Sequence, residues 1–236
     1  MSESWVNISE RIIHMLMLKS YFLDDVGLME GKMGVILAML EYSKVNKEPV
    51  IADFSFELLD HLMTNIPRGL SFSFDKGLSG IGWGIEYLLN NQLAEGVGVE
   101  ICEEIDREIM QMNPLYIIDT SLKNGIEGLL HYIIFHTQNA QKQKCDLPFD
   151  NRYYENMYET CKRLKKETHS KNLECLLNTY CLFFEKGKVE NYSLQLLDFA
   201  FVPANLPEKI VSYPLGLTNG LAGILLHLMG ENKKYE

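Results

Sequence analysis

The sequence lacks any long hydrophobic run. Its longest strongly apolar stretches, residues 33–40 and 221–229, are less than half the roughly 20 residues that a membrane-spanning helix needs. The N-terminal residues contain no basic region that leads into an apolar one. We therefore expect neither a membrane span nor a secretory signal.

Proline, tryptophan and positive charge are also scarce. The 236 residues include 7 prolines and 2 tryptophans, and 22 lysines and arginines stand against 32 aspartates and glutamates, a formal net charge of −10. The hydrophobic fraction of 47% is average for a globular protein and excludes a disordered or collagen-like chain. Because the net charge is negative, non-specific binding to nucleic acid or to an anionic membrane is disfavoured.

The five cysteines are an odd set without a C-x-x-C pair. Secreted domains that depend on disulfides usually carry an even number of cysteines at close spacing. The pattern therefore favours a reducing compartment, and we expect a cytoplasmic protein.

A glycine-rich frame recurs four times, beginning at residues 27, 77, 121 and 216, and reads G-L-x-x-G-x-x-G-[VIL] with serine first in the third copy. Its structural glycines are Gly31, Gly34, Gly77, Gly84, Gly125, Gly128, Gly220 and Gly223. Two glycines one helical turn apart allow another backbone to approach a helix start closely. The last interval is about twice the others, which predicts a degenerate fifth copy with Cys175 in place of the final glycine.

Apolar segments follow the frames, and amphipathic segments lie between them. Residues 34–40, 129–135 and 221–229 are hydrophobic nearly all round, which is typical of buried helices. In residues 97–109 and 154–166, apolar side chains recur at helical spacing opposite charged ones. We therefore predict an all-α single domain over residues 1–236. It would contain about five hairpins, each with an outer amphipathic helix followed by a glycine-led inner helix.

Tandem helical hairpins with G-x-x-G-[VIL] at the start of each inner helix resemble the lanthionine synthetase C-like (LanC-like) family. The resemblance covers nearly the whole chain and implies an α/α toroid whose glycine turns gather at one mouth. Family enzymes close seven hairpins, so about five hairpins imply a shortened, incomplete ring. In active members, two cysteines and a histidine hold a zinc ion, which lowers the pKa of the peptide thiol that forms a thioether.

The resemblance places the zinc cysteines in the two residues before the first glycine of a Gly-x-x-Gly pair. The pairs in this chain are Met29-Glu30, Ser79-Gly80, Lys123-Asn124, Ser170-Lys171 and Thr218-Asn219. None contains a cysteine or a histidine, so we expect no metal and no other cofactor, and no catalytic residue is assigned. If the chain is an enzyme, the resemblance favours a thioether-forming cyclase with a non-standard site.

Several residues in or near the frames are candidates for binding a peptide at the mouth: Glu30, Lys123, Asn124, Glu127, Lys171, Asn219, Trp83, His131 and His227. The N-termini of the inner helices would add free N–H groups that attract peptide carboxylates. Each group of candidates also has a structural alternative. Asparagine is a good helix cap, tryptophan fits between helices, and a histidine on an inner helix fits a hydrogen-bonded interior position.

Three functions remain open. The first, which we favour, is a zinc-free, non-catalytic LanC-like homologue that binds a precursor or leader peptide or scaffolds a peptide-modifying enzyme. The second is a carboxylate-dependent enzyme on an α/α toroid, such as a glycosidase. Its acid and base would come from Glu30, Asp75, Asp119 or Glu127, although two tryptophans are few for stacking sugars. The third is a helical scaffold without a small-molecule site.

Overall fold

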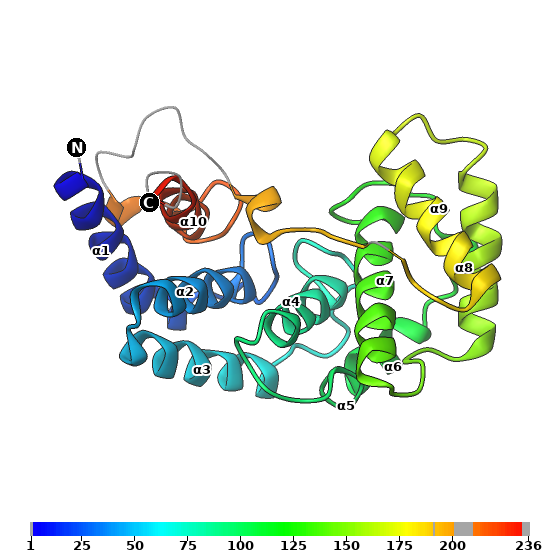
Figure 1. Cartoon of the computed structure of the whole chain (residues 1–236), viewed down its shortest axis with the longest axis horizontal. Helices are drawn as coiled ribbons and strands as arrows, with labels where there is room; N and C mark the ends of the chain where they lie inside the picture. The colour runs from blue at the N-terminus through cyan, green and yellow to red at the C-terminus, as the bar shows by residue number, and fades with distance from the viewer. Residues whose placement is uncertain (1, 191, 201–209, 233–236) are drawn as a thin grey trace. The chain divides into compact units, whose positions relative to one another are not determined.

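A computed structural model describes residues 2–190, 192–200 and 210–232 (Figure 1). These ranges contain ten α-helices, four short 3-10 helices and no strand. The prediction of an all-α fold is confirmed, whereas the ring that the resemblance implies stays a prediction. No helix in the described ranges combines the length and the apolar character needed to cross a bilayer.

The chain divides into two compact units. Unit 1 comprises Met1–Leu70 and Gln195–Glu236, and unit 2 comprises Ser71–Leu194. This division into compact units does not test the prediction of a single domain over residues 1–236.

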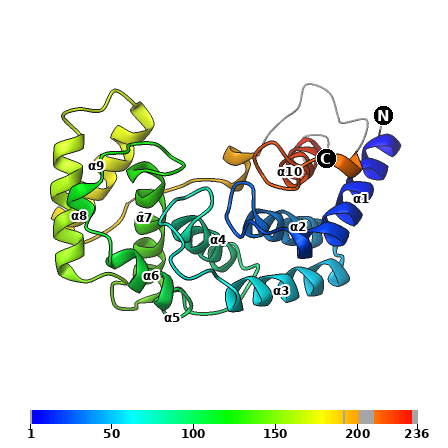
Figure 2. The ribbon, with the colours of Figure 1, turned by 180° about the vertical axis from the view of Figure 1, so that it is seen from behind.

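Unit 1 is built around helix α2. Its elements are α1 (Ser2–Lys19), η1 (Ser20–Phe22), α2 (Lys32–Asn46), α3 (Pro49–Thr64), η3 (Leu196–Phe199), η4 (Ile210–Ser212) and α10 (Leu221–Asn232). Helices α3 and α10 both pack against α2 (Figures 1 and 2). Every residue of α2 from Lys32 to Leu40 is buried, whereas α3 buries a single face. The sequence patterns of an inner and an outer helix are therefore realised in this pair.

Unit 2 is built around helices α4 and α7, which pack against each other. Its elements are α4 (Leu78–Asn90), α5 (Gly98–Ile101), α6 (Glu103–Met110), η2 (Pro114–Tyr116), α7 (Ile126–Gln143), α8 (Asn151–Leu164) and α9 (Lys171–Lys186). Residues 78–88 of α4 and 128–137 of α7 are buried on all sides. Helices α8 and α9 form a hairpin, and α9 also packs against α7 (Figure 2).

Four inner helices, α2, α4, α7 and α10, begin with the same local structure. We call residues 25–34, 71–80, 119–128 and 214–223 frame loops 1 to 4. In each, the N–H of the first helical residue donates to the carbonyl seven residues earlier. The bonds are Lys32 to Asp25 (2.8 Å), Leu78 to Ser71 (2.8 Å), Ile126 to Asp119 (2.9 Å) and Leu221 to Pro214 (2.8 Å). The recurring sequence frame therefore marks one repeated structure.

Glycine is required in the frame loops because other backbone lies too close for a side chain. A Cβ added at Gly125, the N-cap of α7, would overlap the backbone of residues 119 and 121 in its own loop. A Cβ added at Gly128 would overlap the Leu122 carbonyl and the Phe74 side chain of frame loop 2. The glycine pair thus shapes the loop and lets two frame loops pack together.

The structure corrects the register of the second frame. Helix α4 begins directly after Gly77, its N-cap, so Gly77 and Gly80 take the places that Gly31 and Gly34 take at α2. Gly84 lies inside α4, about one turn beyond Gly80, and is not equivalent to Gly34. The residues before the N-cap glycine are therefore 75 and 76, rather than 79 and 80.

The expected fifth copy does not form a frame loop. Helix α9 begins at Lys171 after Ser170, whose Oγ accepts a hydrogen bond from the N–H of Leu173 at 3.4 Å. This is an ordinary serine cap. Cys175, placed by the sequence at a buried glycine position, is exposed on α9. The prediction of a fifth copy at this position is wrong.

Candidate functional site

Each frame loop carries a polar residue directly before the glycine that precedes the helix. These residues are Glu30, Lys76, Asn124 and Asn219. Glu30 is half-buried, and the other three are exposed. Asn219 has a left-handed φ of 58°, a conformation that asparagine adopts more readily than most residues. A polar side chain, acidic in loop 1, basic in loop 2 and an amide in loops 3 and 4, thus occupies the same place in all four loops.

In each frame loop, a loop carbonyl accepts a hydrogen bond from the first N–H group of the helix that follows. In frame loop 1, the N–H groups of Lys32 and Met33 donate to the carbonyls of Asp25 and Val26, and frame loop 4 has the equivalent pair of bonds. These donors therefore do not form the anion site expected from the sequence. The N-cap of α7 is Gly125, so the alternative interpretation of Asn124 as a helix cap is wrong.

The frame loops pack in pairs within each unit. In unit 2, the N–H of Asp75 donates to the carbonyl of Lys123 at 3.2 Å, which joins loops 2 and 3. In unit 1, the N–H of Thr218 donates to the carbonyl of Met29 at 2.9 Å, which joins loops 4 and 1. Both bonds link the fifth residue of one loop to the fifth residue of the other. Lys171 lies outside the frame loops, at the start of α9.

Trp83 and His131 lie inside unit 2 rather than on its surface. Trp83 is fully buried, and its Nε1 donates to the Tyr192 hydroxyl at 3.0 Å. That hydroxyl lies 3.0 Å from Nδ1 of His131. Burial lowers the pKa of His131 to about 4. His131 is therefore neutral near pH 7 and shares a hydrogen bond with the Tyr192 hydroxyl. Both side chains fit the structural alternative, whereas His227 is half-buried on α10.

The carboxylates near frame loops 2 and 3 differ in their surroundings. Asp75 is buried, and its Oδ1 has no hydrogen-bond partner among the described residues. Glu127, in the first turn of α7, is half-buried, and burial raises its pKa. Asp119 is exposed, and its Oδ1 accepts from the N–H of Ser121 at 2.8 Å. This last contact is an Asx turn, so Asp119 shapes the loop.

Sequence reasoning did not identify the first residue of the frame loop. Asp25 accepts from the N–H of Gly27 at 2.8 Å, as Asp119 does from Ser121, and Ser71 makes the weaker equivalent contact at 3.4 Å. In three of the four loops an Asp or Ser stands six residues before the N-cap glycine, whereas the fourth loop has Pro214 there. The frame was read from its glycines alone, so this signal was not used.

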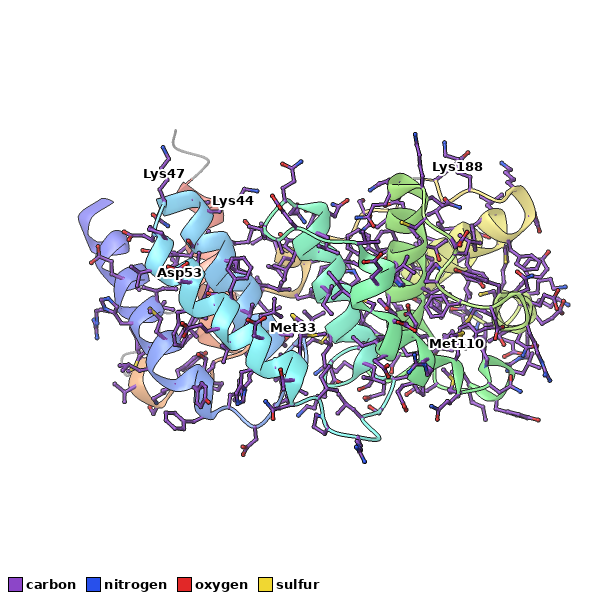
Figure 3. The ribbon with its side chains drawn as sticks, turned by 90° about the horizontal axis from the view of Figure 1, so that it is seen from below. Met33, Lys44, Lys47, Asp53, Met110 and Lys188 are labelled. Atoms are coloured by element: carbon purple, nitrogen blue, oxygen red, sulfur yellow. The ribbon has the colours of Figure 1, made fainter. Side chains whose placement is uncertain are left out.

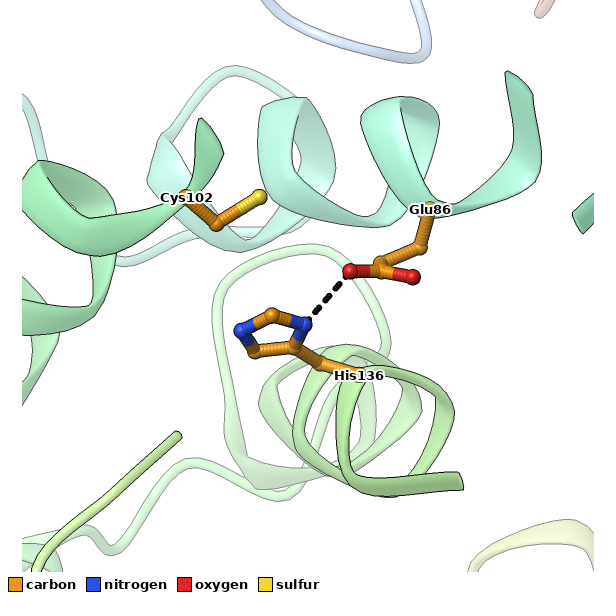
Figure 4. A group of neighbouring side chains, drawn as sticks. All are labelled: Glu86, Cys102 and His136. Atoms are coloured by element: carbon orange, nitrogen blue, oxygen red, sulfur yellow. Dashed lines mark hydrogen bonds and ion pairs between the residues drawn. The ribbon is translucent and has the colours of Figure 1, made fainter. Parts of the chain in front are cut away.

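A second cluster of ionisable side chains, which the sequence also did not predict, lies in the core of unit 2. Nδ1 of His136 lies 2.5 Å from Oε1 of Glu86, and Nε2 lies 2.8 Å from Oδ2 of Asp106. The three side chains are at most 4% exposed. Figure 4 shows Glu86 on α4 facing His136 on α7, with Cys102 close by. The signal in the sequence was a charged residue at apolar positions of α4 and α6.

Neighbouring donors complete this buried triad. The Tyr132 hydroxyl donates to Oδ1 of Asp106 at 2.6 Å, and Nδ2 of Asn139 donates to Oε2 of Glu86 at 2.6 Å. Burial lowers the pKa of His136, but the hydrogen bonds and charges of the two carboxylates outweigh it and raise the pKa to about 9. His136 is therefore an imidazolium at neutral pH and donates from both nitrogens.

The zinc site that the resemblance implies does not fit these residues. In the described ranges, the one group with the composition of a metal site is Glu86, Cys102 and His136, whose ligand atoms lie within 4.8 Å of one another. Both nitrogens of His136 donate to carboxylates, which leaves no lone pair for a metal. Burial also raises the pKa of Cys102 well above its usual value, so its thiol stays protonated. With the corrected register, the pairs before the four frame glycines still contain no cysteine or histidine.

Comparisons with known proteins give no match that could assign a function to these sites. No protein-family model, no curated protein and no solved structure matches the chain. The function therefore has to be argued from the sites themselves.

Proposed function

We propose that the chain is a LanC-like helical-repeat protein that binds a peptide at its frame loops and does not itself form a thioether. The observation that carries this proposal is the polar residue before the helix-start glycine in all four loops. Loop carbonyls satisfy the first N–H groups of the helices, so these side chains are not needed as caps. We take the recurrence of a polar residue at this position, beyond the solvent exposure of Lys76, Asn124 and Asn219, as a feature of a binding surface.

Frame loops 2 and 3 offer two lysines to an acidic peptide, beside the carboxylates of Asp75, Asp119 and Glu127. Lys76 and Lys123 are exposed on this loop pair, and the exposed Asn124 amide is able to hydrogen-bond a peptide backbone. Each exposed ion pair contributes little by itself, so we expect modest affinity that falls as salt is added. The partner would be a precursor or leader peptide, free or held by a peptide-modifying enzyme in the cytoplasm.

Calorimetry tests this proposal with the peptides encoded by neighbouring genes. The double variant Lys76→Glu, Lys123→Glu should weaken binding of an acidic peptide by about 1 to 2 kcal/mol, and the loss should shrink at high salt. Lys188→Glu is the matched control, because Lys188 is an exposed lysine of unit 2 that follows α9 and lies outside the frame loops (labelled in Figure 3). The proposal fails if no peptide binds below about millimolar affinity. It also fails if the control weakens binding as much as the double variant does.

A carboxylate-dependent enzyme is the second candidate. It is favoured by the Oδ1 of Asp75, which is buried and has no partner among the described residues, and by the raised pKa of Glu127 on the adjoining loop. An acid and a base with different surroundings are what glycoside hydrolysis needs. The variants Asp75→Asn and Glu127→Gln should then abolish glycoside turnover, whereas a peptide-binding protein would show no turnover to lose. The burial of Trp83 removes one residue that such an enzyme would use to stack a sugar.

A further inference from the structure

A segment without helix or strand follows α9 in unit 2 and contacts both inner helices of that unit. We call residues 187–190 and 192–194 the strap, which leaves α9 as an extended trace (Figure 1). The Gln141 side chain of α7 holds its beginning, because it donates to the first strap carbonyl at 2.9 Å and accepts from the N–H of Val189 at 3.0 Å. Further along, Tyr192 makes the hydrogen bonds of the strap to α4 and α7.

The phenol of Tyr192 occupies a site that is complementary to both its hydroxyl and its ring. The hydroxyl accepts a hydrogen bond from Nε1 of Trp83 on α4 at 3.0 Å and lies 3.0 Å from Nδ1 of His131 on α7. The ring lies 5.3 Å from the Phe135 ring, between centroids, and meets the His131 ring edge-on at 5.8 Å. We call Trp83, His131 and Phe135 the phenol site; Trp83 is fully buried, and the other two are at most 8% exposed.

The phenol site requires an occupant that carries a hydroxyl group. The indole N–H of Trp83 is only a donor, so a buried occupant without an acceptor would leave it unpaired at a desolvation cost. Burial lowers the pKa of His131 to about 4, so its neutral ring offers one donor and one acceptor nitrogen. Because a hydroxyl both donates and accepts, it serves Trp83 and His131 together. A phenylalanine ring would fill the same space and satisfy neither.

The phenol site adjoins frame loops 2 and 3. The Phe74 ring of frame loop 2 lies 6.0 Å from the Trp83 ring and 5.8 Å from the His131 ring, between centroids. Trp83 and His131 are each the sixth residue of an inner helix that begins directly after a frame loop. They therefore lie about 7.5 Å along the helix axis from its start. A ligand at these loops and an occupant of the phenol site would be neighbours.

We propose that Tyr192 is a displaceable plug, and that the phenol site takes a tyrosine side chain of the peptide that binds frame loops 2 and 3. The identity of the peptide rests on the proposed function, whereas the chemistry of the site rests on the contacts of Tyr192. The Tyr192 side chain is half-buried, and its neighbours Glu190 and Ser193 on the strap are exposed. Exchange of the two tyrosines therefore requires movement of the strap and of no helix. Because both compete for the same hydrogen bonds, the plug lowers the apparent affinity for the peptide by the fraction of molecules in which the site is open.

The first test uses the full chain and 4-methylphenol, which is the tyrosine side chain without its backbone. A Trp5→Phe background leaves Trp83 as the single tryptophan, so its indole N–H gives one signal in ¹⁵N NMR. In Tyr192→Ala, 4-methylphenol should shift this signal saturably, and toluene, which lacks the hydroxyl, should bind about tenfold more weakly. Tyr116→Ala is the matched control, because Tyr116 is 80% exposed and lies off the strap. It should respond to 4-methylphenol no more than the wild type does.

The second test measures peptide binding by calorimetry. The probes are the synthetic peptide Asp-Glu-Gly-Tyr-Gly-Glu-Asp and its counterpart with phenylalanine in place of tyrosine. Tyr192→Ala should tighten binding of the tyrosine peptide several-fold and that of the phenylalanine peptide much less. Tyr192→Phe keeps the ring but loses both hydrogen bonds, so it should give a smaller gain in the same direction. This second variant decides the proposal if Tyr192→Ala fails to fold.

The outcomes separate this proposal from the proposed function. If 4-methylphenol binds Tyr192→Ala no better than toluene does, the phenol site is refuted, even where peptides still bind the frame loops. If 4-methylphenol binds as expected but the Tyr192 variants do not favour the tyrosine peptide, Tyr192 is a structural contact and the plug is refuted. If no acidic peptide binds any form of the chain while 4-methylphenol binds as expected, the proposed function fails, and with it the peptide as the occupant.

Discussion

Replacing His136 by glutamine removes the imidazolium that lies between Glu86 and Asp106 in the core of unit 2. The variant leaves two buried carboxylates without their cation. Breaking a buried ion pair in this way typically costs about 3 to 5 kcal/mol, because the remaining charge keeps its desolvation cost. We therefore expect the free energy of unfolding to fall by about that amount near pH 6.5.

The cost should also depend on pH with a definite sign. The pKa of His136 is about 9 in the folded chain, above the ordinary value of 6.5. Its stabilising contribution is therefore fully present below pH 6.5 and is lost as the pH rises through 9. The difference corresponds to about 3 kcal/mol. Burial raises the pKa of Asp106, which acts in the same sense, because the folded chain again holds a proton that the unfolded chain releases at lower pH.

Urea unfolding of the wild type and of His136→Gln, measured between pH 6 and pH 9.5, tests this reasoning. The difference in unfolding free energy should shrink by about 3 kcal/mol across that range. The comparison cancels the titration of Cys102 and Tyr132, which are present in both proteins. His169→Gln is the control, because His169 is exposed, and it should change stability by less than about 0.5 kcal/mol. A difference that is small or constant with pH would show that His136 is not an imidazolium held by two carboxylates.

Two further predictions concern the frame loops and the metal. Gly128→Ala should destabilise unit 2 by about 1 to 3 kcal/mol, because its Cβ would overlap the Leu122 carbonyl and Phe74. Gly230→Ala in α10 should be neutral or stabilising, since its Cβ would meet Leu197 only at 3.8 Å; melts that shift equally would contradict the close approach. Protein purified without chelator should contain no stoichiometric zinc by elemental analysis, and one zinc per chain that is lost in His136→Gln would contradict the ion triad.

The sequence predicted the inner helices well because they depend on local signals. Continuous apolar character marked α7 and α10, and glycine before a helix marked the frame loops. The register of the second loop was misread because Gly77, Gly80, Gly82 and Gly84 allow several alignments. Only hydrogen bonds such as Leu78 to Ser71 select one of them.

Sequence patterns alone do not predict the buried triad. Glu86, Asp106 and His136 lie on three different helices, and a charged residue at an apolar position of α4 or α6 does not by itself say which residues it meets. Contacts between helices, rather than periodicity within one helix, bring this cluster together.

Amide hydrogen exchange tests the central claim, peptide binding at the frame loops, most directly. The full chain is compared with and without an acidic peptide encoded by a neighbouring gene, and the mass of the peptide is recorded in the same samples. We predict protection of residues 71–80 and 119–128, with the peptide recovered at unchanged mass. Protection confined to other segments, or a peptide mass changed by turnover, would contradict the account.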